Sequence, residues 1–160
     1  MTNDPESQLV STHEELLSYF DADQVPYRLD SSSGRILLPI EHGSLQSTMA
    51  LYWPHNANLV QMILGIPARV PEEQVDPVCR AIAQINHALA MPGFGFDAAG
   101  GYAYYRLVQP RRKDGSLTVA DLQRLFSTTT RTAAQFNEPL TAIIEGTMSP
   151  SDLTTLLSGT

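Results

Sequence analysis

The sequence predicts an α+β domain in which helices pack on an antiparallel β-sheet. Strand-like segments follow one another between residues 25 and 67 with no helix between them, which predicts antiparallel neighbours. Helical segments with one apolar side stand before and after this run. The 160 residues contain no internal repeat and no low-complexity linker, so we expect one domain over residues 1–146 and a tail over residues 147–160.

The first helix is expected from Asp4 to Phe20. Asp4 can cap a helix, Pro5 suits the first helical turn, and apolar residues recur from Leu9 at helical spacing. A last helix is expected from its cap at Thr118 to Gly146. We expect the apolar stripes of these two helices to cover the same face of the sheet, because exposing either stripe to water would cost several kcal/mol.

Four strand-like segments occupy residues 25–29, 35–40, 47–53 and 59–66. Their boundaries are turn-forming sequences, among them Asp30–Gly34 and Pro54–Asn58. The segment Leu59–Ile66 differs from the others because apolar residues occupy both of its faces. Such a composition is typical of a strand that is covered on both sides.

A second helix is expected to begin with Asp76 as its cap and Pro77 as its first residue, and to end before Pro92. Its apolar stripe consists of Val78, Ile82, Ile85 and Leu89. Since the first and last helices cover one face of the sheet, this helix is expected to shield only part of the other face. The apolar surface left over predicts self-association.

A β-hairpin is expected over residues 94–108, around the turn-forming sequence Asp97–Gly101. The sequence does not determine its register, and a slip of one residue would exchange the two faces of the hairpin. Phe94 and Phe96 share a face either with Tyr102 and Tyr104 or with Ala103 and Tyr105. The exposed or buried state of the aromatic rings depends on this choice.

The end of the chain carries two further signals. Pro139 is expected to kink or split the last helix. Beyond Gly146, the sequence Ser149–Asp152 could start a short helix in the tail. The apolar residues of that helix would be Leu153, Leu156 and Leu157.

The formal net charge is −7, and residues 1–79 hold 11 acidic but only three basic side chains. An acidic surface repels phosphate backbones, so nucleic acid is not an expected partner. It attracts positive charge, so we expect the partner segment to carry basic residues. The N-terminus lacks the pattern of a signal peptide, and no apolar run is long enough to span a membrane. A single cysteine, Cys79, suits a reducing compartment. We therefore expect a cytoplasmic protein without a membrane partner.

The sequence offers no cluster of residues for catalysis or metal binding. The four histidines lie in separate segments without metal-ligand spacing, and neither a nucleophile elbow nor a phosphate loop is present. We therefore expect no catalytic residue, no metal and no cofactor. The histidines are His13, His42, His55 and His87.

Several short segments together resemble a known family. They are Leu16-Leu17, Val25-Pro26-Tyr27, Ile85-Asn86, Phe94-Gly95-Phe96-Asp97, Gly101-Tyr102-Ala103-Tyr104-Tyr105-Arg106 and Pro139-Leu140-Thr141-Ala142-Ile143-Ile144-Glu145-Gly146. Over residues 9–146 the chain resembles the YbjN family of bacterial proteins. The resemblance implies a fold similar to class I type III secretion chaperones, often a homodimer, and a regulator linked to stress responses that has no known catalytic residues. The proline near the end of the last helix and the Leu-rich tail depart from a secretion chaperone proper.

These observations favour a non-enzymatic adaptor or chaperone-like regulator that holds a flexible segment of a partner protein. The alternatives are a regulator that senses a small ligand, a true type III secretion chaperone and an unrecognised enzyme. Large aromatic residues often dominate binding energy, so the candidate partner anchors are Trp53, Tyr102 and Tyr104, unless these rings are ordinary core. The candidate homodimer interface consists of Leu59, Ile63, Val78, Ile82, Ile85 and Leu89.

Overall fold

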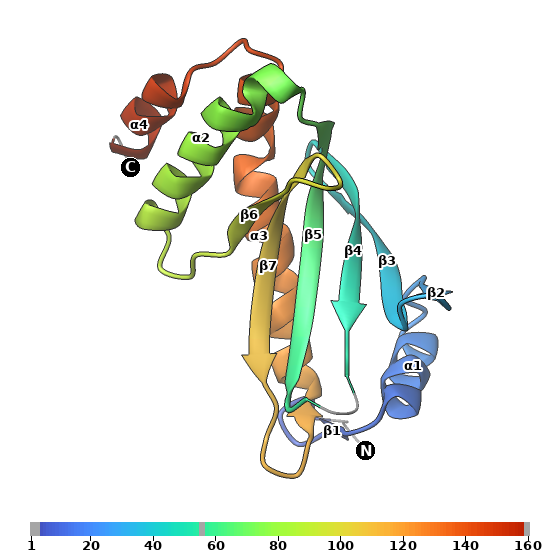
Figure 1. The fold of residues 1–160 in the computed structure, drawn as a ribbon. Coiled ribbons are helices and arrows are strands. Elements are labelled where there is room, and N and C mark those ends of the chain that lie inside the picture. Colours follow the sequence, from blue (N-terminus) through green and yellow to red (C-terminus); the bar gives the residue numbers. More distant parts are fainter. Residues whose placement is uncertain (1–3, 55–56, 159–160) are drawn as a thin grey trace.

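The computed structural model describes residues 4–54 and 57–158, and within them six strands form an antiparallel sheet in the order β2-β3-β4-β5-β7-β6 (Figure 1). The predicted turn Pro54–Asn58 has its centre, His55 and Asn56, outside the described residues. The strands of the sheet are β2 (Arg28–Asp30), β3 (Arg35–His42), β4 (Leu45–Tyr52), β5 (Leu59–Arg69), β6 (Phe94–Asp97) and β7 (Tyr102–Pro110). All neighbours in this sheet run antiparallel, as the lack of helical crossovers predicts.

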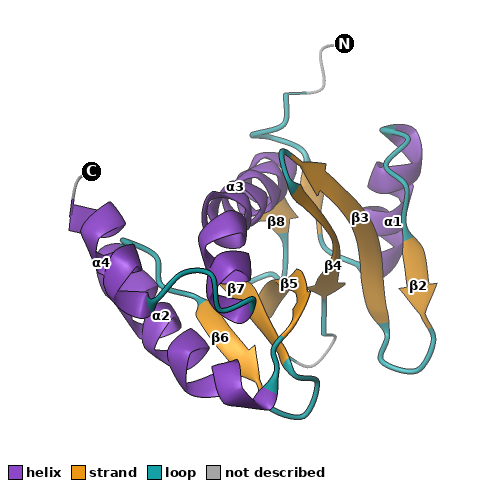
Figure 2. Ribbon diagram, turned by 90° about the horizontal axis from the view of Figure 1, so that it is seen from above, coloured by secondary structure: helices purple, strands orange, loops and turns teal. Residues whose placement is uncertain are grey.

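Four α-helices accompany the sheet. They are α1 (His13–Ala22), α2 (Val75–Ala88), α3 (Val119–Ile144) and α4 (Pro150–Ser158). Figure 2 shows α3 along one face of the sheet with α1 on the same side, whereas α2 and α4 lie beside β6. Phe20 of α1 packs against Phe126 of α3 with ring centroids 5.9 Å apart, so the apolar sides of the first and last helices meet on one face of the sheet, as predicted.

The core lies between α3 and the strands. Residues that alternate along β4, namely Met49, Leu51 and the adjoining Trp53, are buried as their spacing predicts. Phe94 of β6 packs edge-on against Phe136 of α3, with ring centroids 5.5 Å apart. The same core cluster contains the buried apolar residues of all four helices, including Leu153 of α4. The tail therefore does form a short helix, and that helix packs on the domain.

The first helix starts later than predicted. Its cap is Thr12, whose hydroxyl accepts from the Glu15 amide, while the Glu15 carboxylate accepts from the Thr12 amide. This reciprocal capping box fixes the helix start at His13 more strongly than Asp4 can fix an earlier one. Leu9–Val10 forms a short strand, β1, that pairs with β8 (Leu117–Thr118). A local periodic pattern cannot reveal this pairing, because its partner lies more than a hundred residues away.

The second helix differs from its prediction in position as well as in its start. It begins at Val75, after a 3₁₀ turn over Glu72–Gln74, so Pro77 stands within the first turn. It packs beside α3, α4 and β6, and its apolar stripe joins the common core. It therefore does not shield the opposite face of the sheet, contrary to the expectation. A proline in the first turn removes no helical hydrogen bond, which explains the earlier start.

The last helix runs unbroken from Val119 to Ile144 despite Pro139, so the proline does not split it. Its cap is Thr118, as predicted, and the Thr118 hydroxyl accepts from the Asp121 amide at 3.0 Å. Buried Phe136 and Leu140 flank the proline and hold this part of the helix on the core. Tertiary packing therefore outweighs the local cost of the proline.

The hairpin adopts the second of the two possible registers. Phe94 pairs with Tyr105 and Phe96 with Ala103, so these residues face the helices. Tyr102 and Tyr104 consequently lie on the other face of the sheet. The register follows from packing, since it places Phe94 and Tyr105, with ring centroids 5.0 Å apart, next to α3.

Candidate binding face of the sheet

The face of the sheet that points away from α3 is called the open face here. In Figure 1 this face is turned to the viewer, and no helix of the described residues lies in front of β4, β5 or β7. Strand pairing aligns its residues in rows across the sheet. One row contains Leu37, Ala50, Ile63 and Arg106, and the neighbouring row contains Tyr52, Gln61 and Val108.

A hollow of about 410 Å³ lies on the open face, across β3, β5 and β7. Its walls combine two guanidinium groups, two phenol rings, one aliphatic side chain and one carboxylate, and Phe96 of β6 also lines it. The residues that supply them are Arg35, Arg106, Tyr102, Tyr104, Ile63 and Asp97. The turn after β6 closes one end with Ala98 and Ala99.

Two glycines make room for the tyrosine rings of the hollow. A Cβ atom on Gly95 would lie 2.6 Å from Cζ of Tyr104, and one on Gly100 would lie 2.3 Å from Cε1 of Tyr102. Both distances are far below van der Waals contact, so the rings occupy the space that a side chain would need. The glycine-rich sequence around this hairpin therefore positions the aromatic part of the open face.

The aromatic rings contact each other and one of the guanidinium groups. The centroids of Tyr102 and Tyr104 are 6.4 Å apart with an interplanar angle of 61°. Cζ of Arg106 lies 6.0 Å from the centroid of Tyr104. A guanidinium at this distance is attracted to the ring and still has N–H groups free for other partners.

The carboxylate of Asp97 is held by the turn that follows it. It accepts hydrogen bonds from the amides of Gly100 (3.1 Å) and Ala99 (3.0 Å). The Gly100 amide above all, with the Ala99 amide and the Tyr102 hydroxyl, lowers the pKa of Asp97 below its ordinary value, so the group is ionised at neutral pH. Burial, and next the negative charge of Asp97, raise the pKa of Tyr102.

The two guanidinium groups of the hollow form no ion pair with the residues that the structure describes. Among the described residues, the ion pairs all involve Arg124, which joins Glu6 and Asp121 at a distance from the hollow. Arg35 and Arg106 are exposed and form no ion pair with another described residue. The hollow therefore has a local excess of positive charge in a protein whose net charge is −7.

Residues 12–142 match the model of the YbjN family, which is described as "Putative bacterial sensory transduction regulator". The chain belongs to the YbjN family. The match covers the whole six-stranded sheet and every residue that lines the hollow. Neither a curated protein nor a solved structure matches the chain. The likeness to the secretion-chaperone fold therefore stays a prediction, whereas the α+β architecture of this YbjN-family chain is observed.

The three predicted partner anchors do not lie together. Tyr102 is 38% exposed and Tyr104 is half-buried on the open face, but Trp53 is only 3% exposed and belongs to the core. The indole of Trp53 lies under the guanidinium of Arg111, with 5.1 Å between Cζ and the ring centroid. Trp53 therefore has no surface for a partner, because alternation along β4 turns it toward the helices.

The predicted dimer residues also separate into two groups. Leu59 and Ile63 lie half-buried on the open face, where they can reach a second molecule. Three residues of the α2 stripe, Val78, Ile82 and Ile85, are buried in the core of the chain itself, and Leu89 is half-buried beside it. The α2 stripe is therefore needed for folding and is not free to form an interface.

The charged residues of the hollow were missed by sequence reasoning. Arg35, Asp97 and Arg106 lie in three different strands, and only the strand order β3-β4-β5-β7-β6 brings them to one face. One sequence signal was present, since Arg106 alternates with Tyr104 and Tyr102 along one strand and must share their face. The basic turn that starts at Arg111 has a structural role: its side chain donates to the carbonyls of Pro54, Ala57 and Gly115.

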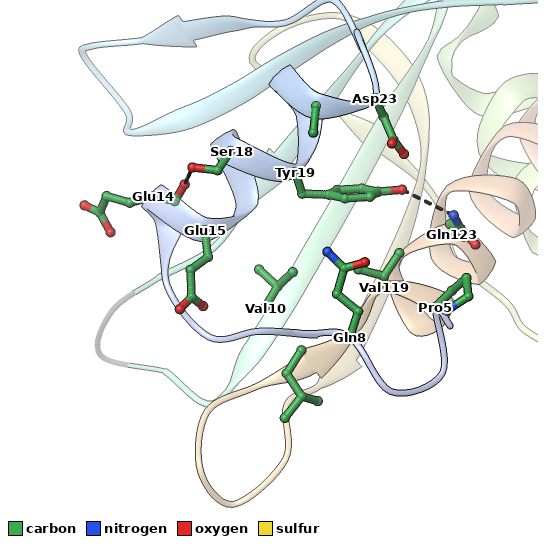
Figure 3. Close-up of a pocket in the computed structure, with 12 residues that line it drawn as sticks. Pro5, Gln8, Val10, Glu14, Glu15, Ser18, Tyr19, Asp23, Val119 and Gln123 are labelled. Atoms are coloured by element: carbon green, nitrogen blue, oxygen red, sulfur yellow. Dashed lines mark hydrogen bonds between the residues drawn. The ribbon is translucent and has the colours of Figure 1, made fainter. Parts of the chain in front are cut away.

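A second concave surface lies between α1, the N-terminal segment and the start of α3 (Figure 3). This groove has a volume of about 600 Å³. Tyr19 crosses it, and its hydroxyl accepts a hydrogen bond of 3.3 Å from the Gln123 amide group. Val10 and Val119 lie beneath the ring, and the acidic side chains at the rim are Glu14, Glu15 and Asp23.

The groove beside α1 is less suited to be the main site than the open face. The carboxylate of Glu15 is already used by the capping box of α1. Among the described residues, no group of three histidine, cysteine, aspartate or glutamate side chains is arranged to hold a metal ion, in this groove or elsewhere.

No helix of the described part of the chain combines the length and the hydropathy that a membrane crossing requires.

Proposed function

We propose that this YbjN-family protein is a non-enzymatic regulator that holds an extended, flexible segment of a partner protein against the open face of its sheet. The observation that carries the proposal is the face itself, because it presents aromatic and aliphatic side chains that no described helix covers. Tyr102 is 38% exposed on this face, and Tyr104 and Ile63 are half-buried beside it. We also propose that it acts in a stress response, which the resemblance to the family implies, and in the cytoplasm, where a single cysteine suits the reducing conditions.

The chemistry of the open face suits a protein segment. Tyrosine offers a large apolar surface together with a polar hydroxyl, and it loses little conformational entropy when it is buried at an interface. An extended segment places every second side chain on one side, about 7 Å apart, which suits the spacing of residues on a sheet surface. The family description as a regulator agrees with a function that rests on binding.

A second candidate is a regulator that senses a small ligand. The hollow favours it, because about 410 Å³ falls within the range of roughly 300–1,000 Å³ that is common for small-molecule sites. A small ligand would raise the melting temperature by mass action in the absence of any protein partner. A protein segment would instead be protected from proteolysis by the chain.

Photo-crosslinking tests the protein-segment proposal. We expect a photoreactive phenylalanine derivative in place of Tyr102 or Tyr104 to label one and the same segment of a partner protein, because the two rings share the open face. The same derivative in place of Leu156, which is 54% exposed on α4, is the matched control and should not label that segment. Mass spectrometry of the crosslinked peptides identifies the segment. Labelling that is equal at all three positions would contradict the proposal.

We further propose that the chain forms a homodimer through the end of the open face that carries Leu59, Tyr52 and Val108. Leu59 pairs with Pro110, and Val108 pairs with Gln61, which in turn pairs with Tyr52, so these side chains adjoin one another. A strand that is apolar on both faces but covered by a helix on only one is typical of an interface. The residues that line the hollow, among them Ile63 and Tyr102, do not include these three.

Light scattering tests the dimer. We expect the unaltered chain to have twice its monomer mass at tens of micromolar protein, and Val108→Asp to have the monomer mass, because a buried unpaired carboxylate opposes association. Leu156→Asp introduces the same charge at an exposed site on α4 and should leave the dimer intact. A monomer mass for the unaltered chain would refute this proposal and leave the crosslinking prediction standing.

A further inference from the structure

We infer that the partner segment held on the open face is acidic and apolar, and that one of its carboxylates sits between Arg35 and Arg106. The inference rests on the proposed function and adds the chemical class of the partner to it. It is the opposite of what the net charge predicts, since an acidic protein was expected to attract a basic segment. The difference arises because the local charge of the hollow has the opposite sign to the charge of the whole chain.

The charged groups of the hollow differ in whether they already have partners within the described part of the chain. Its one carboxylate, Asp97, already accepts hydrogen bonds from the amides of Ala99 and Gly100. Its two guanidinium groups, Arg35 and Arg106, have no ionic partner among the described residues. The groups that remain available to a ligand are therefore cationic, and they complement a carboxylate.

The surroundings of Arg106 strengthen this match. Its Cζ lies 6.0 Å from the centroid of the Tyr104 ring, so one side of the group is next to an aromatic surface and not fully hydrated. A planar guanidinium in this setting can still donate two parallel N–H bonds to a carboxylate. Ile63, which pairs with Arg106 across the strands, supplies an apolar contact directly beside the charge.

The arrangement predicts a pattern in the partner segment. In an extended chain, residues two positions apart point to the same side and lie about 7 Å from each other. An acidic residue above Arg106 would place its neighbour two positions away above the apolar part of the face, at Ile63 or Tyr104. We therefore expect an aspartate or glutamate followed or preceded, two positions away, by an aliphatic or aromatic residue.

A second copy of this chain is a poorer occupant of the hollow than a partner segment. A two-fold contact centred here would bring the guanidinium groups of the two copies together, and like charges across an interface oppose association. The acidic residues of α1, Glu14 and Glu15, line the groove beside α1 and not the open face. The proposed dimer contact at Leu59 and Val108 therefore leaves the hollow to another protein.

A random-peptide display library selected on the full, immobilised chain tests the inference. We expect the selected peptides to be enriched in aspartate and glutamate next to apolar residues in the pattern above. Arg35→Gln and Arg106→Gln should each weaken the binding of a selected peptide by about tenfold to a hundredfold, since each removes hydrogen bonds to a charged group. Arg106→Lys should restore only part of the loss, because lysine keeps the charge but not the paired donors.

Arg80→Gln is the matched control, since Arg80 is exposed on α2, away from the open face, and the substitution makes the same change in net charge. It should leave the dissociation constant unchanged. Arg35 and Arg106 are exposed too, so all variants should keep the melting temperature of the unaltered chain, and a thermal scan verifies this.

The possible outcomes separate the inference from the proposed function. Peptides without acidic residues that still lose binding when Tyr102 is replaced by alanine would overturn the acidic class and leave the open face as the binding site. The acidic class would also be overturned, and the open face kept as the binding site, if the Arg35→Gln and Arg106→Gln variants bound acidic peptides as tightly as the unaltered chain does. Failure to select any peptide would overturn both. The addition of inorganic phosphate or glutarate, without any protein partner, is a further test. If either anion displaced the peptide and raised the melting temperature, the hollow would be a site for a small anion, and the claim that it binds a protein segment would be wrong.

Discussion

Trp53→Ala is expected to lower the free energy of unfolding by about 3–5 kcal/mol, the usual cost of removing a large buried aromatic side chain. The indole is 3% exposed in the core, and the guanidinium of Arg111 rests on it with 5.1 Å between Cζ and the ring centroid. Through Arg111 the ring also supports the carbonyls of Pro54 and Gly115, which accept hydrogen bonds from that side chain. Urea denaturation followed by circular dichroism measures the change.

The matched comparison for this prediction is Tyr102→Ala on the open face. Tyr102 is 38% exposed, so its loss should change stability far less while it weakens partner binding. The two aromatic residues are thereby expected to show opposite effects, one on folding and the other on binding. An unchanged unfolding midpoint for Trp53→Ala would show that the ring is not part of the core and would return it to the set of partner anchors.

Asn86→Ala is expected to lower the free energy of unfolding by about 2–4 kcal/mol, because three hydrogen bonds to the main chain are lost in a partly buried place. The side chain of Asn86 donates to the carbonyl of Phe94 at 2.9 Å and accepts from the amides of Phe94 (3.0 Å) and Gly93 (3.1 Å). These groups lie along the edge of β6 that no strand of the described residues covers, so Asn86 takes the place of a neighbouring strand.

His87→Ala is the control for Asn86→Ala, since His87 is the next residue of α2 and is exposed. It should change the stability by less than about 0.5 kcal/mol. Hydrogen exchange of the Phe94 amide gives an independent measurement, because this amide should lose its protection in Asn86→Ala and keep it in the control. Equal exchange of that amide in the two variants would contradict the role of Asn86 as the cover of this edge.

The sheet strands and their inward faces could be read from the sequence because strand periodicity is local. Alternation between buried and exposed positions predicted Met49, Leu51 and Trp53 as one face of β4, and all three are buried. The same periodicity did not tell which face is the core. The sequence therefore leaves Trp53 open between a partner anchor and ordinary core, and its burial in the folded chain decides for the core.

The candidate site was less accessible to sequence reasoning than the strands. Tyr102 and Tyr104 were recognised as notable, but their exposure depends on a hairpin register that one residue of slip would reverse. Arg35 reaches the hollow from a strand that is three positions away from β7 in the sheet. No spacing along the chain encodes that proximity, because strand order is settled by the burial of whole faces and not by neighbouring residues.

Local sequence signals are sufficient to predict the class of the fold, the positions of the main strands, the family of the chain and the apolar residues on both faces of Leu59–Ile66. Three features appear only in the folded chain: Leu9–Val10 pairs with β8, α2 joins the core, and the open face carries two guanidinium groups that form no ion pair with another described residue. The physical reason is the range of the interactions concerned. Periodicity and capping act within a few residues, whereas strand order, register and the local sign of charge depend on side chains that meet only after the chain has folded.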